Sequence, residues 1–184
     1  MRRDLVERAM AGDHDAFSEL ARVSIARLYA AARLILRDQV RAEDATQEAL
    51  VAAWRDLSAL RDPDRFDAWL HRLLVRACHR EARHGRRRSA IELEAGRSPG
   101  VERDHAIDLA DRDELERGFS RLDADQRTVL VLHHFLGLTL DEVASAMAVP
   151  PGTARSRLHR ATRAMRTALE ADARPTTLTE GRLA

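Results

Sequence analysis

Five arginines recur between residues 149 and 166, behind a Pro-Pro-Gly step and separated by small and apolar residues. The planar donor fork of arginine matches both phosphate oxygens and the O6 and N7 atoms of guanine. No acidic residue lies between Arg155 and Arg166, so the charge of these arginines is not balanced locally. The stretch therefore predicts a nucleic-acid-binding surface, and the alternative is a solvated surface helix without a partner.

Two helices are predicted to position these arginines. Thr139 and Glu142 are spaced as a capping box that starts a short helix, and Pro151 suits the first position of a second one. In the second helix, small and apolar residues fall within a stripe about 100° wide that can pack on a core. A capped helix, a turn and a basic helix together predict a helix-turn-helix, whose second helix can enter a DNA major groove. The stripe comprises Ala154, Leu158, Ala161, Met165, Ala168 and Leu169.

A second row of arginines is predicted on an upstream helix, from about Asp64 to Arg83. The arginines recur three or four residues apart, so they share one exposed face if the helix continues, and their mutual repulsion favours an anionic partner. They are Arg72, Arg76, Arg80, Arg83 and Arg87. The apolar residues expected to face the core are Phe66, Trp69, Leu70, Leu73, Leu74 and Ala77.

The whole chain is predicted to be all-α, because apolar residues recur three and four apart and strand patterns are nearly absent. With 184 residues it can form two small helical domains, which we place at residues 1–85 and 113–170, the second containing the helix-turn-helix. Residues 86–112 begin Arg-rich, pass through Ser, Gly and Pro, and end acidic, which predicts a flexible acidic linker. We expect residues 171–184 to be a loose tail.

Three further helices are predicted in the first domain, before the arginine row. Gly12 ends a short first helix, and Asp13 caps a second that runs to about Arg37. A third helix follows from about Arg41, and acidic and amide residues occupy its exposed first turns, where negative charge is favourable. These residues are Glu43, Asp44, Gln47 and Glu48.

The amino-acid composition limits the classes of function that the chain can have. The 31 basic and 30 acidic residues nearly cancel, so only their distribution can indicate a nucleic-acid partner. A single cysteine, Cys78, leaves no internal disulfide and no cysteine-cluster zinc site. No apolar run reaches membrane-spanning length, and we expect a soluble cytoplasmic protein. The histidines form no HExxH or Cys-paired spacing, so we predict no catalytic residue, no metal site and no cofactor.

Two parts of the chain resemble the bacterial extracytoplasmic-function sigma factors, which belong to the sigma-70 family. Residues 138–144 (LTLDEVA) and 152–161 (GTARSRLHRA) are similar to the C-terminal DNA-binding domain of that family. Residues 42–55 and 66–74 (FDAWLHRLL) are similar to its first domain. The matches occur in the order of the family with a linker between them, and they span about residues 4–170.

The resemblance implies a non-catalytic RNA polymerase subunit that binds core polymerase, recognises the −10 and −35 promoter elements and promotes DNA opening. It implies core RNA polymerase, promoter DNA and an anti-sigma factor as partners, with no membrane insertion. The implied polymerase-binding residues are Asp44, Gln47, Glu48 and Trp54. The implied −10 residues are Arg61, Asp62, Arg65, Phe66, Trp69, Arg72, Arg76, His79 and Arg80. The implied −35 residues are His133, Thr153, Arg155, Ser156, Arg157, His159, Arg160 and Arg163.

Three residues depart from the family pattern and leave the promoter sequences open. Arg76 stands where a polar amide is expected, Thr162 where a further arginine is common, and Pro151 where a charged or aliphatic residue is frequent. The main alternative function is a helix-turn-helix transcriptional regulator that acts without being a polymerase subunit. A receiver domain of such a regulator alternates strands and helices, and the first half of this chain shows only helical patterns.

Overall fold

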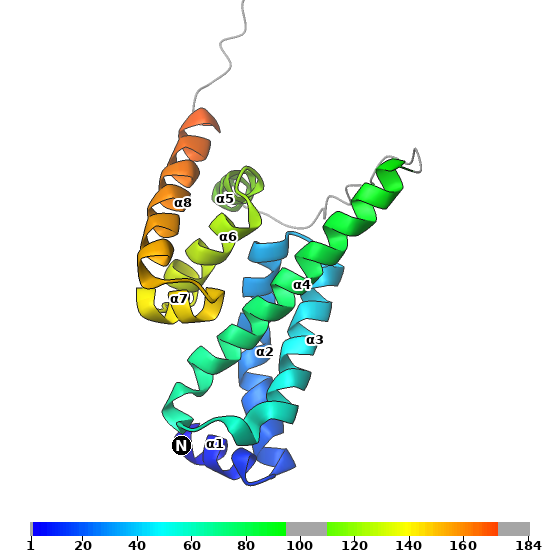
Figure 1. The fold of residues 1–184 in the computed structure, drawn as a ribbon, viewed down its shortest axis with the longest axis vertical. Helices are drawn as coiled ribbons and strands as arrows, with labels where there is room; N and C mark the ends of the chain where they lie inside the picture. The colour runs from blue at the N-terminus through cyan, green and yellow to red at the C-terminus, as the bar shows by residue number, and fades with distance from the viewer. Residues whose placement is uncertain (1, 95–109, 173–184) are drawn as a thin grey trace, which may run out of the picture.

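The all-α prediction is confirmed. The computed structural model describes residues 2–94 and 110–172, and within these ranges every regular element is helical, in two regions that Figure 1 shows. The N-terminal region comprises α1 (Arg2–Met10), α2 (His14–Leu36), α3 (Gln39–Asp56), the short 3₁₀ turns η1 (Leu57–Ala59) and η2 (Pro63–Arg65), and α4 (Phe66–Glu94). The C-terminal region comprises α5 (Ala110–Ser120), α6 (Ala124–Leu130), the π-helical turn η3 (Val131–Phe135), α7 (Leu140–Met147) and α8 (Pro151–Asp172).

The predicted helix starts are confirmed by their side-chain caps. The Asp13 carboxylate accepts hydrogen bonds from the amides of Asp15 and Ala16, both at 3.0 Å, and so starts α2. Asp123 and Thr139 each form a complete capping box, with Gln126 and Glu142 respectively, at the starts of α6 and α7. Helix α8 begins at Pro151, as predicted.

Helix α4 is longer than predicted, since it continues past Arg83 to Glu94. The sequence pattern weakens at Gly85, but this glycine lies inside the helix and is buried. A Cβ at Gly85 would lie 1.7 Å from Nη1 of Arg41, so the glycine leaves room for the guanidinium of α3 rather than breaking the helix. The central part of the predicted linker, 95–109, and nearly all of the predicted tail lie outside the described residues.

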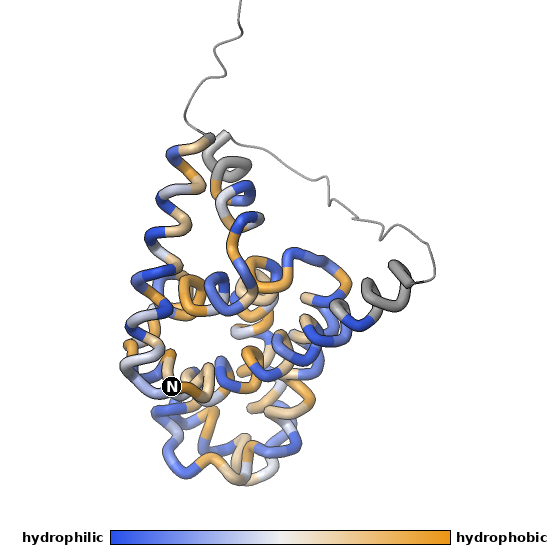
Figure 2. The backbone as a smooth tube through the Cα atoms, turned by 45° about the horizontal axis from the view of Figure 1, so that its top comes forward, coloured by the Kyte–Doolittle hydropathy of each residue, from blue (hydrophilic) through white to orange (hydrophobic). Residues whose placement is uncertain are grey.

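The N-terminal region is a bundle of α2, α3 and α4, with α1 across its end (Figure 1). Helix α3 contributes small buried residues, among them Ala42, Ala45 and Ala49, which let the larger Leu70 and Leu74 of α4 approach closely. Figure 2 shows hydrophobic and hydrophilic residues interleaved along the helices, as amphipathic packing requires.

In the C-terminal region, α7 and α8 form the predicted helix-turn-helix, and α5 and α6 pack on α8. The predicted stripe on α8 faces this core, since Ala154, Ala161 and Ala168 are buried and Leu158 and Met165 pack against it. The opposite face of α8 is left to solvent, which is where the predicted DNA-binding residues lie. Among the described residues, no helix is long and apolar enough to cross a membrane.

Candidate nucleic-acid interface

The outer face of α8 carries exposed basic and polar side chains. Arg155, Ser156, His159, Arg160 and Arg163 are all exposed, and Thr153 is half-buried at the start of the helix. The Ser156 hydroxyl donates to the Thr153 carbonyl at 3.0 Å, and the Arg160 Nε donates to the Ser156 carbonyl at 3.3 Å. Among the described residues, none of the exposed arginines of this face forms an ion pair with a carboxylate. The face is therefore available to a polyanion.

Two predicted −35 residues are instead engaged inside the C-terminal region. The Arg157 Nη1 lies 2.9 Å from the Asp125 carboxylate at the start of α6, so this guanidinium points toward α6. The His133 Nδ1 lies 2.9 Å from the Leu138 carbonyl, in the turn that leads into α7. Both residues position the helix-turn-helix, and neither shares the exposed face of α8.

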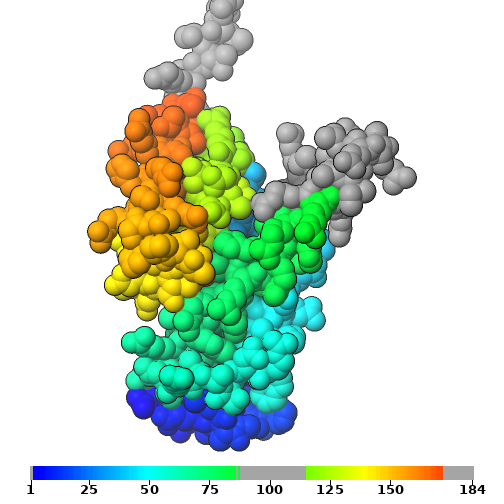
Figure 3. Space-filling model, viewed as in Figure 1, coloured from blue at the N-terminus to red at the C-terminus, as the bar shows by residue number. Residues whose placement is uncertain are grey.

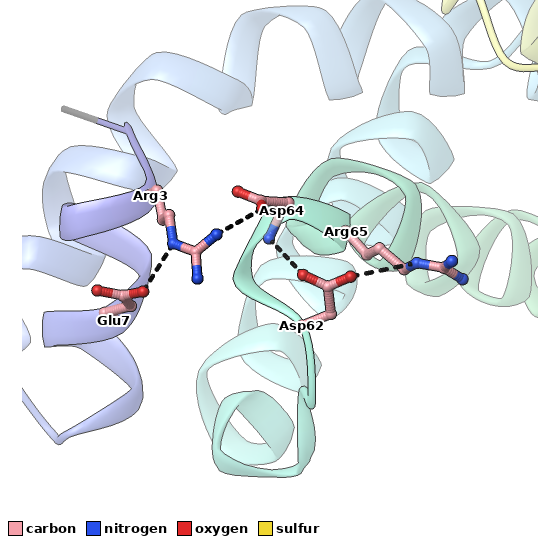
Figure 4. Close-up of polar contacts among 5 residues, drawn as sticks. All are labelled: Arg3, Glu7, Asp62, Asp64 and Arg65. Atoms are coloured by element: carbon pink, nitrogen blue, oxygen red, sulfur yellow. Dashed lines mark hydrogen bonds and ion pairs between the residues drawn. The ribbon is translucent and has the colours of Figure 1, made fainter.

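The predicted −10 loop is held by a chain of carboxylate contacts (Figure 4). Asp62 caps η2, because its Oδ1 accepts the Asp64 amide at 3.0 Å, and its Oδ2 lies 3.4 Å from Nε of Arg65. Arg3 of α1 binds Asp64 at 2.6 Å and Glu7 at 2.9 Å, which ties the loop to the first helix. Arg2 forms a parallel ion pair with Asp67 at the start of α4. These pairs are exposed to solvent, so each contributes little to stability.

The apolar residues beside this loop anchor it. Phe66 is only 3 % exposed, and its ring centroid lies 6.1 Å from that of the half-buried Trp69. Arg61 and Arg65 are exposed at either side of Asp62. The loop therefore presents two arginines and part of Trp69 to solvent, while Phe66 holds its base.

The basic row on α4 is less free than its sequence suggests. Arg72 donates to the Ser145 hydroxyl of α7 at 3.3 Å, and Arg80 binds Glu48 of α3, with Nε to Oε2 at 3.2 Å. The His79 Nε2 lies 3.9 Å from the Asp125 carboxylate of α6. Arg76 is exposed between these residues. The predicted −10 residues of α4 thus share one side of the helix, but most of them already contact other elements.

The predicted polymerase-binding residues lie along α3. Asp44 and Gln47 are exposed, and Glu48 is occupied by Arg80. Trp54 is 37 % exposed, because its ring stacks at centroid distances of 4.5 Å on His14 and 5.0 Å on Phe17.

Two apolar residues of this face were missed by the sequence analysis. Val40 is 60 % exposed and Val51 57 % exposed, and they flank Asp44 and Gln47 at helical spacing. The two valines add exposed apolar area to the polar face that carries Asp44 and Gln47. Their position outside the buried stripe of the helix was the signal that could have identified them.

Two titratable side chains of α4, Cys78 and His71, lie in the core. No cluster of three or more His, Cys, Asp or Glu side chains that could hold a metal ion occurs within residues 2–94 and 110–172. Cys78 is fully buried, and burial raises the pKa of its thiol to about 12, which removes the thiolate that a nucleophile needs. His71 is buried as well, and burial lowers the pKa of its imidazole.

Two family profiles match the chain. The profile described as Sigma-70 region 2 matches residues 20–88, and that described as Sigma-70, region 4 matches residues 112–165. The RNA polymerase sigma-H factor of Pseudomonas aeruginosa is 34% identical over 181 residues, which cover 91% of this chain and 93% of that protein. The ECF RNA polymerase sigma factor SigM of Mycobacterium tuberculosis is 31% identical, over 86% of this chain and 79% of that protein.

Solved structures have the same fold. CnrH, determined in complex with the cytosolic domain of CnrY, aligns with a TM-score of 0.68 and 27% identity over 94% of this chain and 99% of that chain. The sigma factor RpoE of Bartonella quintana, determined with the anti-sigma factor NepR, aligns with a TM-score of 0.70 over 85% of this chain and 98% of that chain, at 23% identity. The second likeness concerns the fold alone.

Proposed function

The chain belongs to the extracytoplasmic-function sigma factors of the sigma-70 family, and from this premise we propose how its surfaces divide the work of transcription initiation. One surface binds core RNA polymerase, a second holds the −10 element open, and a third recognises the −35 element. The observation that carries the proposal is the exposed face of α8, where Arg155, Arg160 and Arg163 have no carboxylate partner among the described residues. The cytoplasm is the location that these partners require.

Recognition of the −35 element is assigned to the first half of α8. The amides at the start of this helix, near Gly152 and Thr153, carry the positive end of the helix dipole and suit a DNA phosphate. Ser156, His159 and Arg160 then face the base edges, where arginine can bond both acceptors of a guanine. Phosphate contacts fix the position of the helix, and the base contacts supply the specificity.

Recognition of the −10 element is assigned to the Asp62–Arg65 loop and to α4. Lifting a base from the stack costs a few kcal/mol, which stacking and phosphate contacts must offset. The exposed Arg61, Arg65 and Arg76 supply cations for the strand backbone, and Trp69 supplies an aromatic surface. Phe66, which is buried, contributes by fixing the loop.

Polymerase binding is assigned to the exposed face of α3. Asp44 and Gln47 provide polar contacts, and Val40 and Val51 provide apolar area, a combination typical of protein interfaces. An anti-sigma factor is proposed as a further partner. Its support is that CnrH, which is 27% identical to this chain, was determined in complex with the cytosolic domain of CnrY.

The docking face is tested by reversing its charge. Asp44→Lys with Glu48→Lys is expected to abolish co-purification with core polymerase, and Glu19→Lys on α2, a side chain that is 41% exposed, is the control for a charge reversal elsewhere on the surface. Unchanged co-purification of the double variant would refute the docking face. A protein that shifts promoter DNA tightly on its own and never joins core polymerase would instead be a free-standing helix-turn-helix regulator.

A further inference from the structure

Helix α1 lies against the loop that we assign to the −10 element. It contacts both η1 and η2, and α4 contacts η2 as well. In the space-filling view of Figure 3, the blue atoms of α1 border the segment that leads into α4, at one end of the molecule. The loop is thus held between two helices, and α1 carries none of the residues assigned to DNA or to polymerase.

A series of polar contacts runs from α1 into the loop (Figure 4). Within α1, Glu7 accepts a hydrogen bond from the Arg3 Nε at 2.9 Å and so orients the guanidinium. The Arg3 Nη1 then donates to the Asp64 carboxylate at 2.6 Å. The Asp64 amide donates to Asp62 at 3.0 Å, and the same Asp62 side chain lies 3.4 Å from the Nε of Arg65. Arg3 is therefore connected, through two loop residues, to an arginine that is assigned to the −10 strand.

A second arginine of α1 contacts the residues just after the loop. Arg2 forms an ion pair with Asp67, which lies in the first turn of α4. Arg2 and Arg3 are adjacent, whereas their partners Asp67 and Asp64 lie in two different elements, α4 and η2. Two contacts at separate points fix the orientation of the loop as well as its distance from α1, which a single contact would not do.

Apolar side chains fill the space between α1 and the loop only in part. A cavity of about 100 Å³ lies there, lined by the buried Val6 and Phe66 and by the exposed Arg3 and Asp64. Atoms that line a cavity make fewer dispersion contacts, so close packing alone does not fix the distance between α1 and the loop. The polar contacts of Arg3 and Asp64 therefore help to set the position of the loop.

The ion pairs of α1 are exposed to solvent and contribute little to the stability of the fold. Recognition is more sensitive, because a site that selects a base has to hold its groups within about 0.5 Å of the productive position. The turn η2 is three residues long, so few hydrogen bonds of its own keep it from shifting. A contact with little effect on unfolding therefore has a measurable effect on the base that is preferred.

We propose that Arg3, together with Arg2, is a positioning residue for the −10 element: the two arginines hold the Asp62–Arg65 loop in the position from which it selects a base, and they do so without contacting DNA themselves. This inference rests on the proposed function and adds α1 to the machinery of the same site. The property that Arg3 controls is the preference among −10 sequences, and neither the affinity for core polymerase nor the stability of the fold depends on it.

Two substitutions that change the net charge in opposite directions test the positioning role. Arg3→Gln removes the guanidinium, and Asp64→Ala removes its acceptor while keeping the backbone amide that bonds to Asp62. A direct contact between Arg3 and a DNA phosphate would make Arg3→Gln bind DNA more weakly and Asp64→Ala more tightly, because the second substitution frees the guanidinium. A positioning role predicts the same defect in both variants.

The measurement is promoter opening by holoenzyme on a series of templates that differ by one base within the −10 element. The fluorescence of a dye attached near the start site reports opening. Arg3→Gln and Asp64→Ala are each expected to lower the preference for the best base about threefold. Arg3→Lys keeps the charge and should retain most of the preference. Urea unfolding and titration with core polymerase should give wild-type values for all three variants.

Arg8→Gln is the matched control. Arg8 lies on the same helix, its side chain is 52% exposed against 59% for Arg3, and it binds Asp13 instead of the loop. The substitution removes a comparable ion pair from α1 without touching the contacts of η2. Holoenzyme that contains Arg8→Gln should therefore show the wild-type preference on every template.

Three results would overturn the inference while the proposed function stands: an unchanged preference in Arg3→Gln, an equal loss of opening on all templates, or opposite effects in Arg3→Gln and Asp64→Ala. The last of these would assign Arg3 to direct contact with DNA. Failure of the proposed function is seen separately, since wild-type protein with core polymerase would then open none of the templates, and the inference would fall with it.

Discussion

Helices α4 and α8 each carry a row of arginines, but the two rows have different surroundings. On α8, Arg155, Arg160 and Arg163 are exposed, and no carboxylate among the described residues pairs with them. On α4, Arg72 is bound to Ser145 and Arg80 to Glu48. One face is available to DNA as the chain folds, and the other is largely engaged by neighbouring elements.

This difference shows that a row of charged residues in the sequence is not necessarily a surface that is free to bind a partner. An arginine with an internal acceptor has already exchanged water for that acceptor, so a phosphate gains only the difference between the two contacts. An exposed arginine without a partner contributes its full electrostatic attraction and counterion release. The face of α8 should therefore dominate promoter affinity, and α4 should contribute only when the protein rearranges.

The largest expected effect comes from removing the exposed arginines of α8. Replacing Arg155, Arg160 and Arg163 together by alanine should weaken promoter binding by holoenzyme on the order of 100- to 1,000-fold, since each contact is worth about tenfold. Fluorescence titration of a mapped promoter fragment measures this loss. Affinity for core polymerase should be unchanged, and a parallel loss of core binding would contradict the separation of the two surfaces.

A smaller effect distinguishes free from engaged arginines within α4. Arg76→Ala should reduce promoter opening about tenfold, because Arg76 is exposed, whereas Arg80→Ala should cost about threefold, because Arg80 already binds Glu48. Permanganate reactivity of unpaired thymines reports the open complex. Equal losses for the two variants would show that the contact with Glu48 does not restrain Arg80.

The stability of α7, the helix that lies against α4, is expected to depend on its N-cap residue Thr139. Thr139→Ala removes the hydroxyl that accepts the Glu142 amide at 3.3 Å, and should lower the free energy of unfolding by about 1 kcal/mol. Urea unfolding measures the loss. Thr139→Ser keeps the hydroxyl and should retain most of the stability, so an equal loss in both variants would argue against capping.

The smallest expected effect is the change in the free energy of unfolding with pH. Burial lowers the pKa of His71 below its ordinary value of 6.5, although Asp67 and Glu142 favour its protonation while Arg27 and Arg2 oppose it. The unfolded chain therefore binds the proton first, and stability should fall as the pH drops below about 6.5 and be fully present above it.

The control for this prediction is His71→Asn, which cannot titrate. Chemical unfolding of both proteins between neutral pH and about pH 5 separates the contribution of this imidazole from that of other groups. The wild type should lose more stability than the variant over this range. Parallel pH profiles would show that His71 does not titrate differently in the folded chain.

Local features of the fold were predictable from the sequence. The caps Asp13, Asp123 and Thr139 lie within three residues of the amides they accept, so spacing alone identified them. The apolar stripe of α8 followed from helical periodicity in the same way. Residue type and short spacing suffice where a contact is made within one element.

Contacts between distant segments could not be predicted. Arg72 and Ser145 are 73 residues apart, and the sequence around neither residue indicates a contact with the other. Arg157 falls at the edge of the apolar stripe of α8, and the sequence does not show that its partner is Asp125 of α6. The extension of α4 past Gly85 was missed for a similar reason, since the guanidinium that accounts for this glycine belongs to α3.

Transcription in vitro by core polymerase on fragmented genomic DNA, with and without the chain, tests the sigma-factor assignment most directly. Mapped start sites that appear only with the chain should share two sequence elements at −10 and −35, and the triple arginine variant of α8 should lose those transcripts. An identical set of transcripts with and without the protein would contradict the assignment.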